Sequence, residues 1–234
     1  MVLGTITKSI FLSQYYIGGI RKGDILTLTN SQFKAKGILI RLRKNGETRI
    51  YPYSFELVLA LKPLYPDNYN SVIENLNLGS IKLPATIVAA MIRTNLDFNN
   101  YNLEDIDKKI SQLERLLSLE HKQLVEELER LKQIIKVLIK EEFFKQIQNR
   151  TEGVIFPRLE YEMFKNHLGR PDIFDKDLSY AIHIATCKYN SNLKIICKTI
   201  GINQKLTSHS PRHSITLQLL DWVATSPIPL TRMC

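Results

Sequence analysis

The sequence contains few cysteines and no arrangement of them that indicates a disulfide framework or a zinc site. Its three cysteines, Cys187, Cys197 and Cys234, are an odd and scattered set without a Cys-x-x-Cys pair. Such usage is typical of a protein kept in a reducing compartment. The sequence also lacks an apolar run long enough to cross a bilayer, and its first residues have no basic segment of the kind that opens a signal peptide. We therefore expect a cytoplasmic protein that does not insert into membranes.

Acidic residues are too few to balance the basic ones. The chain has 32 Lys and Arg against 23 Asp and Glu, a formal net charge of +9 and a sequence pI near 9.4. This balance favours a polyanionic partner, with nucleic acid as the first choice and an anionic membrane surface as the second, although basic proteins without such a partner are common. At 234 residues with 44% hydrophobic residues, the chain is long enough to form one large domain or two small ones.

Glycine and proline are both absent from residue 103 to residue 144. Charged residues fill the helix faces between apolar residues that recur at steps of three and four, at Ile106, Ile110, Leu113, Leu117, Leu124, Leu128, Leu131, Ile135 and Leu138. Such spacing is typical of a coiled-coil seam, although Glu120 interrupts it and the repeated step of four after Leu124 is a stutter. We predict one long helix, or an antiparallel pair broken near residues 120–121, whose seam dimerises or packs within the chain.

The segments on either side of this stretch have globular patterns. Before it we predict a helix over about 5–17 ended by Gly18 and Gly19, a short helix over 20–28, and strands over 37–42 and 48–51. The Asn45-Gly46 pair favours a tight hairpin turn between the strands, and Ser54 caps a helix that runs to about residue 61.

After the stretch we predict a short buried segment over 154–157 and a series of helices over 178–188, 192–200 and 212–224, with one more from residue 227. Gly201 is expected to end the second of these helices, and residues 207–211 are expected to form a loop. The predicted fold class is therefore mainly α with a small antiparallel β-hairpin or sheet (α+β).

Two charged groups stand at element boundaries in the N-terminal part. Arg21 follows the glycine break, and Asp24 comes one helical turn later, where it orients Arg21 or caps the helix. Lys44 lies at the predicted hairpin tip, where a lysine can reach a DNA groove or, when partly desolvated, act as an acid. Taken singly, a surface arginine with a capping aspartate and a solvated turn lysine are the plainer explanations.

A third group lies near the C-terminus, where residues 207–215 carry His209, Arg212 and His213 at a loop-to-helix boundary. Such a boundary offers backbone N–H groups and a positive dipole end, which together with Arg and His side chains suit a phosphate that gains charge during a reaction. By itself the group is also compatible with histidines that satisfy local backbone atoms.

Together and in this order, the three groups resemble the tyrosine recombinase (phage integrase) family. Residues 19–26, Gly-Ile-Arg-Lys-Gly-Asp-Ile-Leu, look like the first arginine box of that family. Residues 43–46, Arg-Lys-Asn-Gly, stand where its hairpin lysine belongs, and residues 206–214, Leu-Thr-Ser-His-Ser-Pro-Arg-His-Ser, look like its His-x-x-Arg box. Residues 153–157 and 192–196 also resemble intervening segments, so the resemblance covers roughly residues 5–66 and 151–234.

The resemblance implies a domain organisation. Residues 1–66 would form the first part of a tyrosine-recombinase-like catalytic domain, residues 67–150 an inserted helical, coiled-coil-like segment, and residues 151–234 the second part. In the family a Gly-His pair and a nucleophilic tyrosine follow the His-x-x-Arg box, and no tyrosine of this sequence stands in that context. We therefore expect a bacterial or phage-encoded fragment, incomplete at its C-terminus and inactive in cleavage as it stands.

The resemblance also implies a reaction, site-specific recombination or integration of DNA by strand cleavage and rejoining through a phosphotyrosine intermediate. Catalytic roles would fall to the phosphate clamp and the general acid, namely Arg21, Arg212, His209 and Lys44. Asp24 and His213 would support them, and Arg21, Lys44 and Arg212 would contact DNA. The implied partner is double-stranded DNA, with self-association on it as a further possibility, and the chemistry uses no metal, cofactor or small-molecule substrate.

Two alternatives to this function remain open at this stage. In the first, the chain is a non-catalytic remnant that binds DNA or a partner protein through the inserted helix. In the second, it is a basic coiled-coil scaffold, which accounts for the middle of the chain but leaves the order of the flanking motifs to coincidence.

Overall fold

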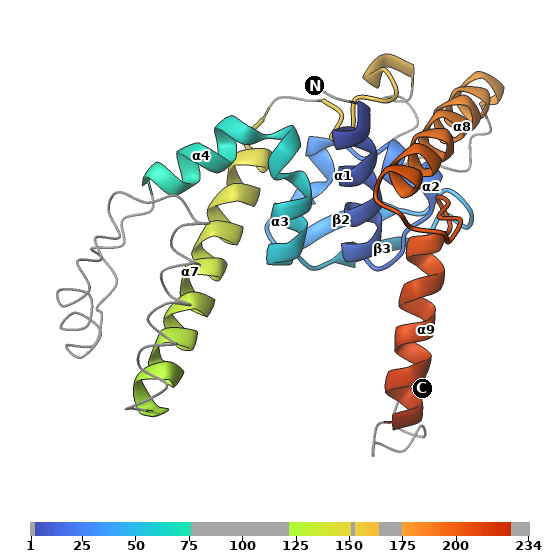
Figure 1. The fold of residues 1–234 in the computed structure, drawn as a ribbon. Helices are drawn as coiled ribbons and strands as arrows, with labels where there is room; N and C mark the ends of the chain where they lie inside the picture. The colour runs from blue at the N-terminus through green and yellow to red at the C-terminus, as the bar shows by residue number, and fades with distance from the viewer. Residues whose placement is uncertain (1–2, 76–121, 151–152, 164–174, 226–234) are drawn as a thin grey trace. The chain divides into compact units, whose positions relative to one another are not determined.

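The structure, a computed structural model, describes residues 3–75, 122–150, 153–163 and 175–225 (Figure 1). These residues are mainly helical and contain one three-stranded antiparallel sheet, which agrees with the predicted α+β class. The chain divides into two compact units, a first unit of residues 1–65 and 144–234 and a second unit of residues 66–143. No helix among the described residues is both long and apolar enough to cross a membrane.

The first unit begins with helix α1 (Leu3–Tyr16), which ends at two consecutive glycines with left-handed backbone. Gly18 has φ 83° and Gly19 has φ 69°, a conformation that costs a residue with a side chain about 1–2 kcal/mol. Helix α2 (Lys22–Leu26) follows and is shorter than the predicted 20–28. It begins later because Arg21, at φ −70° and ψ 152°, is still extended and serves as the N-cap.

The sheet has the order β1 (Phe33–Lys34), β2 (Gly37–Arg41) and β3 (Thr48–Tyr51), and a short 3-10 turn (Asn30–Gln32) precedes it. Ile38 and Ile40 of β2 are buried, while Leu39 between them is partly exposed. This period-two alternation places one face of the sheet against the core. The side chains of Lys34 and Leu39 consequently lie on the outer face.

The hairpin between β2 and β3 is not the predicted tight turn on Asn45-Gly46. Leu42 N donates to Glu47 O at 2.8 Å, and Gly46 N donates to Leu42 O at 2.9 Å, which closes a four-residue loop over residues 43–46. Gly46 has φ 69° and supplies the left-handed residue of this loop. The backbone of Arg43, the first residue of this loop, donates a hydrogen bond to Asp24 of helix α2, described below.

Helices cover the rest of the first unit. Helix α3 (Phe55–Leu61) starts as predicted at Ser54, whose Oγ accepts a hydrogen bond from Leu57 N at 3.1 Å. It is followed by 3-10 turns over Lys62–Leu64 and, later in the chain, Tyr161–Met163. Between them residues 153–156 run beside residues 28–30, with Ile155 N donating to Leu28 O at 2.9 Å. Ile155 and Phe156 of the predicted buried segment are indeed buried.

Helix α8 (Lys176–Thr199) is continuous, so the prediction of separate helices over 178–188 and 192–200 is wrong. The polar residues 190–192 suggested a break, but Tyr189, Leu193 and Cys197 are buried at steps of four across it. Packing of this stripe holds the helix together despite weak local propensity. The predicted end is confirmed, since Gly201 has φ 73° and Ile202 N donates to Cys197 O at 2.9 Å, as in a Schellman cap.

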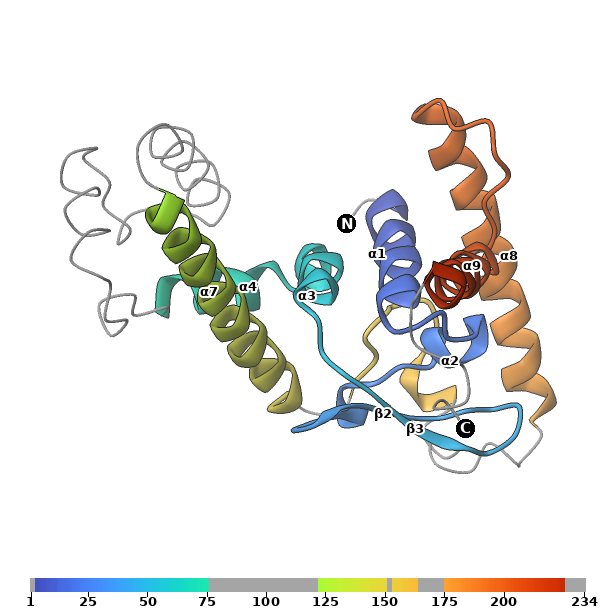
Figure 2. The same cartoon turned by 90° about the horizontal axis from the view of Figure 1, so that it is seen from below.

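Helix α9 (Ser210–Thr225) completes the first unit. In Figures 1 and 2 helix α1 lies between α3 on one side and α8 and α9 on the other, and it contacts all three. The core therefore forms around α1, whose Ile10 is fully buried together with Ile17 just after the helix, Leu57 of α3 and Tyr189 of α8.

The second unit contains helix α4 (Pro66–Asn75) and most of helix α7 (Lys122–Gln148), whose last residues belong to the first unit. The predicted seam of α7 is confirmed at Leu131 and Ile135, which are buried, but is wrong at Leu138. Leu138 is 36% exposed and Ile139 is buried in its place, because the buried stripe continues in steps of four to Phe143. The other predicted seam side chains and the predicted helix from residue 227 lie outside the part that is described.

Candidate functional site

The first unit contains a cleft of about 640 Å³ between its helices and the hairpin loop. All six residues singled out in the sequence line it, although up to 192 positions separate them along the chain. They are Arg21, Asp24, Lys44, His209, Arg212 and His213. The structure therefore places the three sequence motifs around one hollow.

A buried glutamine connects the segment that carries Arg21 with the segment that carries His209. Gln14, on the last turn of α1, is 1% exposed. Its Nε2 atom donates to Ile20 O at 2.7 Å and to Ser208 O at 2.8 Å. One amide group thus holds the residue before Arg21 and the residue before His209 at fixed positions, which a flexible surface contact would not do.

The wall formed by the start of α9 is held in place by a hydrogen bond to helix α8. Helix α9 begins at Ser210, two residues earlier than predicted, with Pro211 in its first turn where proline is tolerated. Ser208 N donates to Asn190 Oδ1 of α8 at 2.8 Å, which ties the loop down before the helix starts. The rings of His209 and His213 follow at a centroid separation of 6.5 Å, and both residues are exposed.

Asp24 connects helix α2 with the hairpin. Its side chain is 3% exposed, and its Oδ1 atom accepts a hydrogen bond from Arg43 N at 3.1 Å. Burial raises the pKa of this carboxyl above its ordinary value, while the Arg43 hydrogen bond and the charges of Arg43, Arg21 and Arg212 oppose the rise. Asp24 was expected to support Arg21; its hydrogen bond goes to the hairpin, and it acts on Arg21 through charge.

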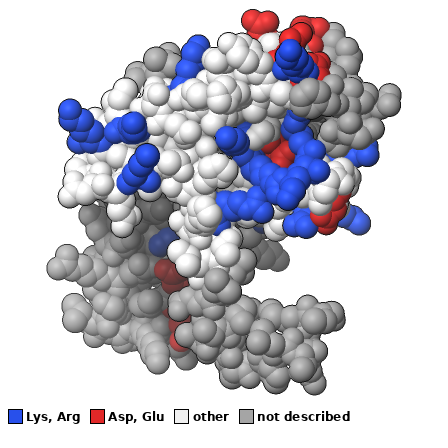
Figure 3. Space-filling view, turned by 90° about the vertical axis from the view of Figure 1, so that its right-hand side faces the viewer, with Lys and Arg blue, Asp and Glu red and all other residues white. Residues whose placement is uncertain are grey.

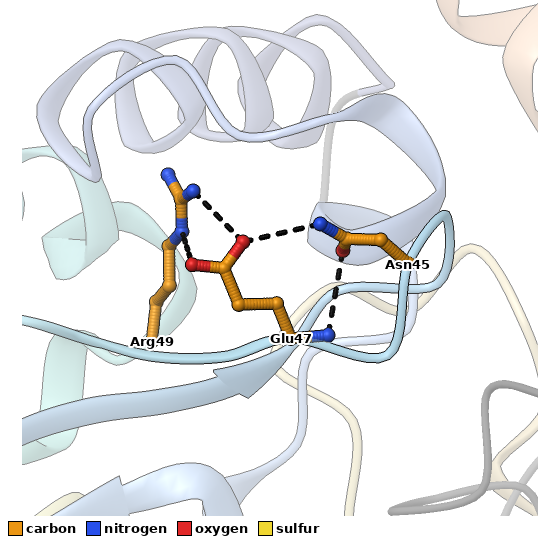
Figure 4. A network of polar contacts seen from close by, with 3 residues as sticks. All are labelled: Asn45, Glu47 and Arg49. Atoms are coloured by element: carbon orange, nitrogen blue, oxygen red, sulfur yellow. Dashed lines mark hydrogen bonds and ion pairs between the residues drawn. The ribbon is translucent and has the colours of Figure 1, made fainter.

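Lys44 is exposed on the hairpin loop, and the hairpin also carries a polar network of residues that do not line the cleft (Figure 4). Arg49 donates to both carboxylate oxygens of Glu47, at 3.0 and 2.9 Å, and Asn45 Nδ2 donates to Glu47 Oε2 at 3.1 Å. The Arg49 hydrogen bond, followed by that of Asn45, lowers the pKa of Glu47. The network shapes the loop and leaves the cleft side to Arg43 and Lys44.

The structure adds lining residues to which the sequence analysis assigned no role in the site, namely Gln14, Ile20, Lys22, Gly23, Arg43, Ser179, Ile182 and Ser208. Arg43 and Lys22 each stand directly beside a predicted residue, so the local basic pairs were a usable signal. Ser179 and Ile182 come from α8, and only the three-dimensional packing reveals that this helix forms a wall.

Positive charge dominates the cleft. Its lining includes five Lys and Arg residues and one acidic residue, Asp24. Figure 3 shows that Lys and Arg side chains gather around a hollow on this face of the molecule. Arginine clamps hold phosphate oxygens by two parallel hydrogen bonds and stabilise charge that develops on them. The cleft is therefore suited to an anionic ligand with phosphate groups.

Beneath the lining lie three buried polar atoms that have no hydrogen-bond partner within the described parts of the chain, Gln14 Oε1, Asp24 Oδ2 and Ser208 Oγ. Buried polar groups without partners are uncommon and are often retained at functional sites. The described residues include no group of three or more His, Cys, Asp or Glu residues that could hold a metal ion.

No known protein family, characterised protein or solved structure matches this chain.

Proposed function

We propose that the cleft binds the phosphodiester backbone of double-stranded DNA, as the phosphate clamp of a tyrosine-recombinase-like catalytic domain. The observation that carries this proposal is the convergence of three motifs on one cleft. Their order along the chain is the order in the family that the sequence resembles. A chance set of basic residues would have no reason to gather from an N-terminal helix cap, a hairpin loop and a C-terminal helix start.

Four of the lining residues have a direct role in the proposed reaction. Arg21 and Arg212 bind the nonbridging phosphate oxygens together with His209, where added charge in the transition state is stabilised. In the proposed recombination reaction a tyrosine oxygen attacks phosphorus and the bond to the leaving strand oxygen breaks. Lys44 supplies the proton that this oxygen takes up. The described lining contains no tyrosine, so the proposal assigns the clamp and the acid to the cleft and leaves the nucleophile outside it.

The direct test is duplex binding as a function of salt, measured by the fluorescence anisotropy of a labelled DNA. We expect binding at low salt that weakens steeply as salt rises, with a slope of about −0.9 for each phosphate neutralised. Arg21→Ala and Arg212→Ala should each lower the affinity about tenfold and make the slope about one unit shallower. Lys188→Ala is the matched control, because Lys188 is exposed on α8 but does not line the cleft.

Two results would contradict the proposal. Absence of any duplex binding at low salt would exclude the DNA-binding function itself. Equal affinity and equal salt slope for Arg212→Ala and the unmodified chain would remove the cleft from whatever binding is seen.

A second candidate function rests on helix α7. Among its described side chains, Ile134, Val137 and Leu138 are exposed by 47%, 42% and 36% and lie within one turn of each other. Such a face on a helix favours association with a partner, and this observation supports a non-catalytic role through the inserted segment. Sedimentation at two protein concentrations tests it, since Ile134→Glu should abolish any concentration-dependent rise in mass.

A further inference from the structure

The cleft carries more positive charge than a single phosphodiester requires. Its five Lys and Arg residues and one Asp give a net charge of +4 with both histidines neutral, whereas each phosphodiester contributes a single negative charge. Its volume of about 640 Å³ is in the range of sites that enclose whole ligands rather than one small group. Both properties indicate that more than one phosphate enters the cleft.

Two of the five cations, Lys22 and Arg43, have no role in the proposed clamp. Lys22 opens helix α2, and Arg43 passes over the next residue of that helix, with its Cδ 3.8 Å from the position of a Cβ built on Gly23. Both side chains are half-buried, and the backbone of Arg43 is held by Asp24. Arg212 packs instead against Gly19, four residues before Gly23 in the chain and outside helix α2.

We propose that Lys22 and Arg43 form a second phosphate subsite, which binds the phosphodiester next to the one held by Arg21 and Arg212. This inference rests on the proposed function, because it assumes that the ligand is a nucleic acid strand. The anchored backbone of Arg43 lowers the conformational entropy that the hairpin loop loses on binding. The subsite therefore fixes the direction in which the strand runs through the cleft, from the α9 wall toward the hairpin.

Short thymidine oligonucleotides separate the two subsites. A dinucleotide offers one phosphodiester and a trinucleotide offers two, and two further trinucleotides carry a neutral methylphosphonate at one position or the other. With the unmodified chain at low salt, the trinucleotide should bind about tenfold more tightly than the dinucleotide, more than the twofold expected from two binding registers. Either methylphosphonate should cancel most of this gain.

Variants then assign the gain to residues. Arg43→Gln and Lys22→Gln should each reduce the trinucleotide gain to about twofold while dinucleotide affinity stays the same, and Arg43→Lys should keep part of it. Arg41→Gln is the control, because Arg41 lies on the same hairpin but donates its Nε to Gly46 O at 3.1 Å and does not line the cleft. Thermal unfolding of every variant shows whether the fold is retained.

The inference is overturned if the unmodified chain binds the two oligonucleotides within twofold, or if the gain persists in both Arg43→Gln and Lys22→Gln. Salt-dependent duplex binding that survives either result would leave the proposed function intact. Absence of duplex binding at low salt would overturn both together.

Discussion

Gly19 and Arg212 pack so closely that a side chain on Gly19 has no room. A Cβ built on Gly19 would lie 2.9 Å from the Cα of Arg212, and Gly19 has φ 69°. This backbone contact, together with the two Gln14 hydrogen bonds, therefore sets where the second arginine of the clamp lies relative to the first. Because the obstacle is backbone, it cannot move aside as the end of a flexible side chain would.

Gly19→Ala should consequently destabilise the protein by about 2–5 kcal/mol, the sum of left-handed backbone strain and an overpacked contact. Gly201→Ala is the matched control, since Gly201 has φ 73° but nothing within 4 Å of its Cβ position. It should cost only the strain, about 1–2 kcal/mol. Urea unfolding measures both. Equal losses in the two variants would mean that the contact with Arg212 is easily relieved.

Asp24 should hold the hairpin through one oxygen atom. Asp24→Asn keeps an oxygen able to accept from Arg43 N, whereas Asp24→Ala removes the acceptor and leaves that N–H without its partner. The amide of Arg43 should therefore stay protected from hydrogen exchange in Asp24→Asn and lose protection in Asp24→Ala. If both variants exchange like the unmodified chain, the bond does not hold the loop.

The raised pKa of Asp24 gives a pH dependence with a definite sign. The folded pKa lies above the ordinary 3.8 because burial disfavours the carboxylate. Between the unfolded and folded pKa values the folded state binds more protons, so the free energy of unfolding falls as pH rises through this window and is constant above it. The Asp24→Asn variant has no carboxyl group at this position, so its free energy of unfolding should not fall in this window. It should therefore be as stable as the unmodified chain at acidic pH and at least as stable at neutral pH.

The sequence correctly predicted the helix ends that depend on one or a few neighbouring residues. The glycine break after α1, the Ser54 cap and the Gly201 cap each depend on one residue with a distinct backbone or hydrogen-bonding preference, and each lies where it was predicted. The continuity of α8 was missed because it depends on burial of Tyr189 and Leu193, which local propensity does not encode.

The residues of the candidate site likewise fall into two kinds, those that a sequence motif indicated and those that only the tertiary structure reveals. Arg21, Lys44 and Arg212 were identified because they recur in an ordered motif, and they line one cleft. Gln14 was missed because its function is purely tertiary, since it connects two segments 188 positions apart through their carbonyl groups. A buried glutamine in a helix has no sequence signature that distinguishes it from a surface one.

Tyr189 should be a position where removing a polar atom stabilises the protein. It is fully buried, its Oη has no hydrogen-bond partner among the described residues, and burial raises its pKa. Tyr189→Phe should therefore raise the free energy of unfolding by about 1 kcal/mol. Tyr53→Phe should lower it by a similar amount, because Tyr53 Oη donates to Lys34 O at 2.8 Å. Urea unfolding that gives the same sign for both variants would contradict this assignment.

Protonation of Glu47 in acid should loosen the loop that carries Lys44. Hydrogen bonds from Arg49 and then Asn45 lower the pKa of Glu47 below its ordinary 4.5. The order that the carboxylate imposes is therefore complete above that value and is lost as pH falls through the folded pKa. An NMR titration should show the Lys44 amide following the titration of Glu47.

Arg49→Gln should raise the pKa of Glu47 more than Asn45→Ala does, because Arg49 donates to both carboxylate oxygens. A Glu47 that titrates at 4.5 in the unmodified chain would mean that the network does not persist in solution.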